Sequence, residues 1–166
     1  MDITRNYMKI TVITVGKLKE TFYREAVSEY GKRLTRYCKL EIREVEDEKT
    51  IEGASEKAQE QILAKEAERI LHFLPENAYV ITLEIEGRMY DSEAFAEKIR
   101  NLGINGVSHI VFVIGGSLGL HNIIKKKADL AVSFSKMTFP HQLMRVVLLE
   151  QVYRAYRIIN GEPYHK

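Results

Sequence analysis

The residues best suited to chemistry gather toward the C-terminus. His141 and His165 each lie among aromatic and basic side chains, and histidine is the side chain whose ordinary pKa lies closest to physiological pH. Neither histidine has the spacing to a cysteine or to a pair of carboxylates that a metal site requires. We therefore expect titratable groups without a bound metal in this part of the chain.

Charged residues occupy two sides of the helical pattern that runs from Gln142 to Ile159. At about 100° per residue, His141 and Arg145 share one face, while Glu150 and Arg154 lie on roughly the opposite one. Glu150 and Arg154 could form an ordinary surface ion pair worth a few tenths of a kcal/mol. Because this helix is otherwise too apolar for a surface element, a cationic site that faces an anion or a partner subunit is an equal alternative.

The same helix is apolar on nearly every side over 143–149. A helix that packs only on one sheet needs a single apolar stripe, so we expect this one to be buried against two surfaces. A second copy of the chain is the expected partner for one of them.

Strand and helix patterns alternate along the chain and must position these side chains. Short β-branched and apolar runs predict strands at 10–15, 40–45, 79–85, 109–114 and 130–134. Apolar residues at helical spacing predict helices that begin near Thr21, Ser55, Asp91 and Gln142, with a short one after His121. This alternation predicts an α/β fold with a mostly parallel sheet and helices on both faces. The nearly continuous apolar run 109–114 is typical of a central strand.

Three loops of this sheet are candidates for ligand binding. Open α/β sheets bind ligands at the carboxyl ends of their strands, where the loops 83–87, 115–119 and 134–141 fall. The glycines of 115–119 could admit a ligand close to the backbone or simply form a tight turn, and the turn is favoured on this evidence alone. Their spacing does not match a dinucleotide-binding motif. His121, beside them, either faces the ligand or caps the next helix.

The composition sets the broad class. The chain has 166 residues, 45% hydrophobic and 29% charged, with a formal net charge of +2. These values are typical of a globular protein and do not by themselves indicate a nucleic-acid partner. With no apolar run long enough to cross a bilayer and no signal-peptide pattern, we expect a cytoplasmic protein without membrane contact. Residues 1–7 are aperiodic, and we expect them to be an extension or tag remnant outside a single domain over 8–166.

Several motifs together resemble the SPOUT RNA methyltransferases, and within them the small RlmH type. The resemblance extends from Met8 to the C-terminus, and its motifs are specific as a joint pattern rather than singly. They are Val15-Gly-Lys17, Ile81-Thr-Leu-Glu-Ile-Glu-Gly87, Phe112-Val-Ile-Gly-Gly-Ser-Leu-Gly119, Ser133-Phe-Ser-Lys-Met-Thr-Phe-Pro-His141, Arg145, Glu150-Gln-Val-Tyr-Arg-Ala155 and Pro163-Tyr-His-Lys166.

This resemblance implies a fold, a cofactor and a substrate. It implies a deep C-terminal trefoil knot, which general rules of chain threading would not predict, and a homodimer. It implies methylation of N3 of a pseudouridine in large-subunit ribosomal RNA by S-adenosylmethionine, with S-adenosylhomocysteine as the product and no metal. The implied cofactor residues are Leu83, Gly115, Phe134, Ser135, Lys136, Met137, Thr138 and Phe139.

The implied reaction suggests roles for the charged residues. An N3–H must lose its proton before it can attack a methyl group, so the site needs a proton acceptor and a cation that stabilises the anion. We expect Arg154 and the Tyr164-His165 pair to act on the RNA base, in their own subunit or across the dimer, and His141 and Arg145 to shape the cofactor side. The modest net charge predicts a preference for assembled ribosomes over free RNA. The alternative is a non-catalytic RNA- or ribosome-binding dimer, which would take up no S-adenosylmethionine.

Overall fold

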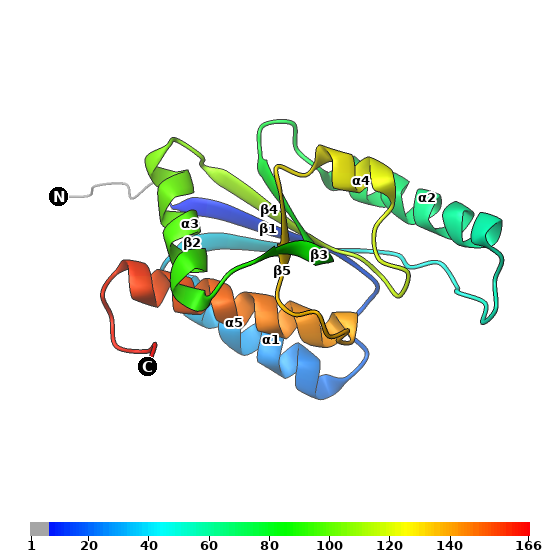
Figure 1. The fold of residues 1–166 in the computed structure, drawn as a ribbon. Helices are drawn as coiled ribbons and strands as arrows, with labels where there is room; N and C mark the ends of the chain where they lie inside the picture. Colours follow the sequence, from blue (N-terminus) through cyan, green and yellow to red (C-terminus); the bar gives the residue numbers. More distant parts are fainter. Residues whose placement is uncertain (1–6) are drawn as a thin grey trace.

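Strands and helices alternate throughout the computed structural model, which describes residues 7–166 (Figure 1). The strands are β1 (Met8–Val15), β2 (Cys38–Val45), β3 (Tyr79–Met89), β4 (His109–Ile114) and β5 (Leu130–Ser133). The helices are α1 (Thr21–Leu34), α2 (Glu56–Phe73), α3 (Ser92–Ile104), α4 (Asn122–Lys127) and α5 (His141–Ile159). Apart from Tyr7, the predicted N-terminal extension lies outside the described residues.

The strands form one sheet in the order β2-β1-β4-β3-β5, and every pairing between them is parallel. The predicted α/β class is therefore confirmed. β4 lies at the centre, and Ile110–Ile114 are all buried. This is the position expected for a strand whose side chains are apolar on both faces of the sheet.

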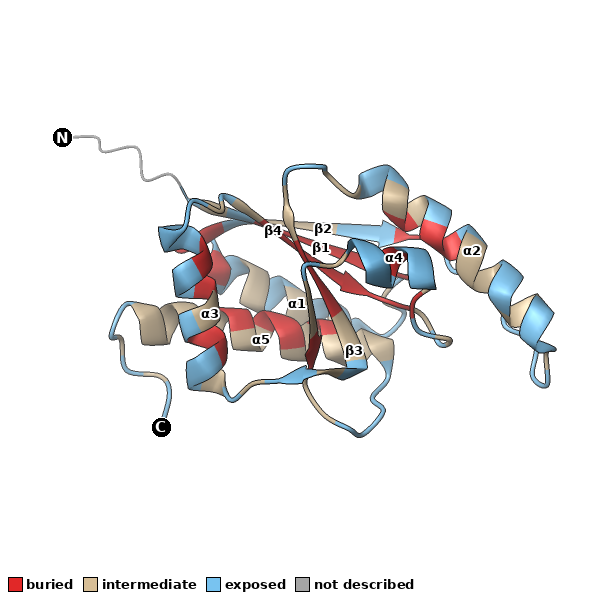
Figure 2. Ribbon diagram, turned by 45° about the horizontal axis from the view of Figure 1, so that its top comes forward, coloured by how far each residue is buried: buried red, intermediate tan, exposed pale blue. Residues whose placement is uncertain are grey.

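Helices cover both faces of the sheet, as predicted (Figure 2). Successive strand residues point to opposite faces, so Ile110 and Phe112 pack with α1, α3 and α5, while Val111 and Val113 pack with α2 and α4. No helix within residues 7–166 is long and apolar enough to cross a membrane.

Three helices begin where the sequence predicts, and two of them start with a side-chain cap. Ser55 accepts a hydrogen bond from the Ala58 amide at the start of α2, and Asp91 accepts one from the Ala94 amide at the start of α3. At α1 the cap position is Glu20, in extended backbone, and Thr21 is already the first helical residue. The Thr21 hydroxyl accepts a hydrogen bond from Arg24 instead of capping the helix.

The predicted end of the third strand at residue 85 is wrong, because β3 continues to Met89 around a bulge. Leu83 and Arg88 both lie opposite Val132 of β5, so the residues between them bulge out of the ladder. Gly87 makes this possible, since a Cβ atom there would lie 2.7 Å from the Val132 carbonyl carbon. Gly87 therefore lets the backbones of β3 and β5 approach closely on one side of the bulge.

Helix α5 packs against α1, α3 and the sheet through one face only. Leu148, Leu149 and Val152 are fully buried in the core shared with these elements. Val146 and Val147, on the rest of the surface, are only half-buried. The second covering surface stays a prediction, as does the threading of α5 through a knot.

Candidate functional site

A cavity of about 180 Å³ opens where β3, β4 and β5 end. It brings together the three loops selected from the sequence. The predicted cofactor residues in its lining are Leu83, Gly115, Phe134, Ser135, Met137, Thr138 and Phe139. Lys136 is not in the lining, although both of its chain neighbours are. The cavity therefore lies at the position that the topology of an open α/β sheet predicts for a ligand.

The glycine loop after β4 is a tight turn that also forms one wall of this cavity. Gly116 and Gly119 pair in an isolated antiparallel bridge, and Gly119 has a positive φ of 81°. A Cβ atom on Gly115 would lie only 2.4 Å from the Gly119 carbonyl oxygen. The two interpretations of these glycines are thus compatible, because the turn brings bare backbone to the cavity.

Apolar side chains surround the opening of the cavity. Met137 is 72% exposed, and Ile85 and Phe139 are also substantially exposed although they line the cavity. The polar groups of the last loop are partly used within it, since the Ser135 hydroxyl accepts a hydrogen bond from the Met137 amide. The result is a mostly apolar site with a few polar groups, which is typical of small-molecule sites.

His141 is the predicted catalytic residue that lines this cavity. It is the first residue of α5, directly after Pro140. Burial lowers the pKa of His141 below its usual range, and the nearby Arg145 lowers it further. The imidazole is therefore neutral at physiological pH and can accept a proton.

Arg145 lies one turn beyond His141 but is not in the cavity lining. Its side chain is only 1% exposed. The guanidinium donates to the Glu44 carboxylate at 2.6 Å and to the Gly16 carbonyl at 2.8 Å. Its Nε atom has no hydrogen-bond partner within residues 7–166. Arg145 therefore connects the ends of β1 and β2 to the first turns of α5, where His141 lines the cavity.

The other predicted catalytic residues form a second cluster near the end of α5. Arg154 contacts the Glu150 carboxylate at 2.6 Å, so the ion pair is present, although it is partly buried rather than on the surface. The Arg154 guanidinium also lies 3.2 Å from Nδ1 of His165 and 4.6 Å from the centre of the Tyr164 ring. The Tyr164 hydroxyl donates to Glu150 at 3.2 Å. We call Glu150, Arg154, Tyr164 and His165 the tail cluster.

The tail cluster and the cavity are far apart within one chain. Arg154 follows His141 by thirteen helical residues, which corresponds to about 20 Å along the helix axis. Asn160, where α5 ends, is about 28 Å from His141 on the same scale. The tail folds back along the helix only as far as Glu150, which the Tyr164 hydroxyl contacts. Glu150 is nine helical residues from His141, or about 14 Å along the axis.

Some lining residues were not singled out from the sequence. Glu84 and Ile85 lie in the predicted ligand loop 83–87 but were not named individually, because the β3 bulge that places them in the cavity has no clear local signal. Met144 also lines it, and its spacing of three residues from His141 could have indicated a shared helix face. His121 is the cap of α4, where its Nδ1 atom accepts a hydrogen bond from the Ile123 amide.

The fold is α/β with a parallel sheet, and its mostly apolar cavity lies at the carboxyl ends of the strands, where proteins of this architecture bind small molecules. A family model described as "Predicted SPOUT methyltransferase" matches residues 8–165. The chain belongs to this family, so the sequence resemblance is confirmed at this level.

Curated relatives match over their full length. The chain is 62% identical to "Ribosomal RNA large subunit methyltransferase H" of Bifidobacterium adolescentis over 159 residues, covering 96% of this chain and 100% of that protein. It is 55% identical, with the same coverage, to the protein of that name in Clostridium kluyveri.

A solved structure with a related fold comes from Haemophilus influenzae and is described as a probable methylase family protein. Its TM-score is 0.51 at 14% identity, covering 96% of this chain and 70% of that one. At this identity the similarity concerns the fold alone.

Proposed function

We propose that this protein is a homodimeric methyltransferase that uses S-adenosylmethionine to methylate N3 of a pseudouridine in large-subunit ribosomal RNA. The observation that carries the proposal is the cavity at the ends of β3, β4 and β5, in a member of the SPOUT family. The names of full-length relatives at 55–62% identity support ribosomal RNA as the substrate class. The ribosome-containing cytoplasm is the corresponding place of action.

The residues of the cavity fit S-adenosylmethionine. The bare backbone at Gly115 and Gly119 allows close approach, and the walls contributed by Leu83, Val132 and Phe134 suit a flat adenine ring. Glu84 also lines the cavity, and its carboxylate accepts a hydrogen bond from the Thr82 hydroxyl at 2.5 Å and pairs with Lys125 at 3.7 Å. When bound, S-adenosylmethionine supplies an electrophilic methyl group and leaves as S-adenosylhomocysteine.

The protein's own groups would prepare the RNA base. An imidazole can take the proton from N3, and in this scheme His141 or His165 would do so. The Arg154 guanidinium would stabilise the anion that forms, with Tyr164 and His165 holding the base against it. Arg145 would keep His141 and the cavity in place without touching the base, because it is buried and bound to Glu44 and Gly16.

The two clusters can act on one base only if they come from different subunits. Within one chain Arg154 lies about 20 Å along α5 from His141, more than a base and a methyl group can bridge. The half-buried side chains Leu143, Val146 and Val147 offer an apolar surface on α5 for a second copy. We therefore propose that the tail cluster of one subunit meets the cavity of its partner.

The substrate would be an assembled particle rather than free RNA. A net charge of +2 gives little general attraction to phosphates, so selection of one nucleotide would depend on the shape of the ribosome.

The test is transfer of a radiolabelled methyl group to ribosomes from cells that lack the modification, followed by mapping of the modified base. We expect one labelled pseudouridine in ribosomes or large subunits and little label in deproteinised RNA. Absence of transfer to any of these substrates would refute the proposed activity. Equal rates on ribosomes and free RNA would refute the preference for the particle.

A further inference from the structure

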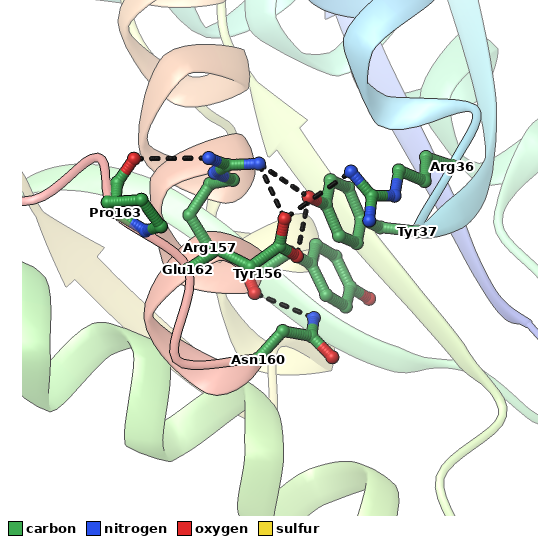
Figure 3. Close-up of polar contacts among 7 residues, drawn as sticks. All are labelled: Arg36, Tyr37, Tyr156, Arg157, Asn160, Glu162 and Pro163. Atoms are coloured by element: carbon green, nitrogen blue, oxygen red, sulfur yellow. Dashed lines mark hydrogen bonds and ion pairs between the residues drawn. The ribbon is translucent and has the colours of Figure 1, made fainter.

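The C-terminal segment 160–166 is attached to the corner between α1 and β2 by a partly buried polar contact (Figure 3). The Glu162 carboxylate accepts hydrogen bonds from the Tyr37 hydroxyl at 2.8 Å and from the Arg157 guanidinium at 2.6 Å. Arg36 adds a longer ion pair at 3.4 Å from an exposed position. We call Tyr37, Arg157 and Glu162 the tail clamp.

Arg157 extends the clamp to the residue before Tyr164. One guanidinium nitrogen donates to Glu162 and to the Tyr37 hydroxyl, while another donates to the Pro163 carbonyl at 3.1 Å. Figure 3 shows the Arg157 side chain between these partners. The clamp therefore fixes both the Glu162 side chain and the Pro163 backbone, and the next residue enters the tail cluster.

The clamp residue Tyr37 is packed into the core of the subunit. Tyr37 is 9% exposed, and its ring stacks on Tyr156 of α5 at 5.6 Å with an angle of 8° between the ring planes. Arg157 and Glu162 are mostly buried, so water competes less for their contact than it does at the exposed Arg36. The tail thus takes its position from the core of the subunit.

The tail is also attached through the tail cluster, whose residues are proposed to act on the RNA base. The Tyr164 ring packs edge-on against Tyr153, and its hydroxyl donates to Glu150. These contacts must adjust when a base is bound between Arg154 and the tail. The clamp has no part in contacting the base, so it can hold the chain while the tail cluster engages the substrate.

We infer that Tyr37, Arg157 and Glu162 are positioning residues that set the place of Tyr164 and His165 in the proposed cross-subunit site. This inference rests on the proposed function, since it assigns the tail a role in methyl transfer. Beyond the proposed function, it predicts that methyl transfer depends on Glu162 and on Tyr37, which lies between α1 and β2.

The experiment is a double-mutant cycle that combines Glu162→Ala with deletion of residues 164–166. In the full chain we expect Glu162→Ala to lower kcat for ribosome methylation about tenfold, with the affinity for S-adenosylmethionine unchanged within about twofold. In the truncated chain the same substitution should cause no further loss, because there is no tail left to position. Tyr37→Phe, which removes a single hydroxyl, should give a smaller loss of the same kind. Glu76→Ala, an exposed residue after α2, serves as the matched control and should leave kcat unchanged.

A structural readout accompanies the kinetics. We expect carboxypeptidase to remove the last residues of the Glu162→Ala variant faster than those of the unaltered chain, while the melting temperatures stay within a few degrees. The inference fails if Glu162→Ala lowers activity equally with and without the tail, or if it leaves kcat unchanged. If deletion of 164–166 has no effect on kcat, the proposed role of the tail fails first. If the unaltered protein transfers no methyl group, the proposed function fails.

Discussion

The two ends of α5 carry similar side chains in different environments. At the start of the helix, Arg145 is almost completely buried and bound to groups at the ends of β1 and β2. Toward the end, Arg154 retains 23% of its side-chain exposure and contacts Glu150 and His165. A buried guanidinium with fixed partners supports structure, whereas one at an accessible surface can bind a further anion. Burial and existing partners, more than residue type, thus distinguish support from chemistry along this helix.

The largest expected effect is on stability and concerns Arg145. Arg145→Met should lower the free energy of unfolding by about 3 kcal/mol, because it leaves the buried Gly16 carbonyl without its donor and removes one of the two donors to the Glu44 carboxylate. Urea unfolding measures this loss. Arg154→Met, which breaks a partly exposed pair, should lower it by less than about 1 kcal/mol. Equal losses for the two variants would remove the contrast between the ends of the helix.

The next effect is on catalysis and concerns Arg154. If its guanidinium stabilises the anion of the base, Arg154→Met should lower kcat about 10²-fold to 10³-fold. Ribosome methylation at saturating cofactor measures it. Arg100→Met is a matched control, since Arg100 also pairs with a glutamate on its own helix, and it should retain full activity. A loss below about threefold for Arg154→Met would contradict the proposed role.

A smaller effect is expected at the cavity wall. Gly115→Ala should weaken binding of S-adenosylmethionine at least about tenfold, because the new methyl group meets the Gly119 carbonyl and the loop must move. Calorimetric titration measures the affinity. Gly31→Ala is the control. Gly31 lies in α1, and a Cβ atom there would make an ordinary contact, 3.9 Å from the Leu40 side chain of β2. Unchanged affinity for Gly115→Ala would show that the ligand binds elsewhere.

The smallest effect is a pH dependence of stability at the cavity end of the helix. The folded-state pKa of His141 lies below its ordinary value near 6.5, chiefly because of burial. As pH falls through the unfolded-state value, the unfolded chain takes up the proton first, so the free energy of unfolding decreases until the folded-state pKa is reached. His141→Gln should therefore reduce the rise in stability between pH 5 and pH 7. His109, whose pKa is also lowered by burial, accounts for part of the remaining rise. An unchanged slope in His141→Gln would contradict the burial assigned to His141.

Local patterns predicted much of the fold and the general place of the site. The run 109–114 indicated the central strand, and the three loops selected for their position at strand ends do meet at one cavity. These features depend on periodicity and on the parallel arrangement of strands, both of which a sequence contains.

The remaining features depend on contacts between distant parts of the chain. Arg145 is 129 residues from Gly16, and Tyr37 is 125 residues from Glu162. No local pattern indicates such partners, so the supporting role of Arg145 and the tail clamp could not be predicted. The bulge in β3 was missed for a related reason, since Gly87 allows close approach only because β5 lies beside it.

The most direct test of a site shared between subunits is a mixed dimer. One subunit carries Gly115→Val, which blocks its cavity, and the other lacks residues 164–166; co-expression with two affinity tags isolates the heterodimer. Each homodimer should retain only about 1% of the activity of the unaltered protein. The heterodimer should recover about half of the activity per dimer of the unaltered protein, because one complete site forms from the open cavity of the truncated subunit and the intact tail of the other. A heterodimer as inactive as both homodimers would contradict the shared site.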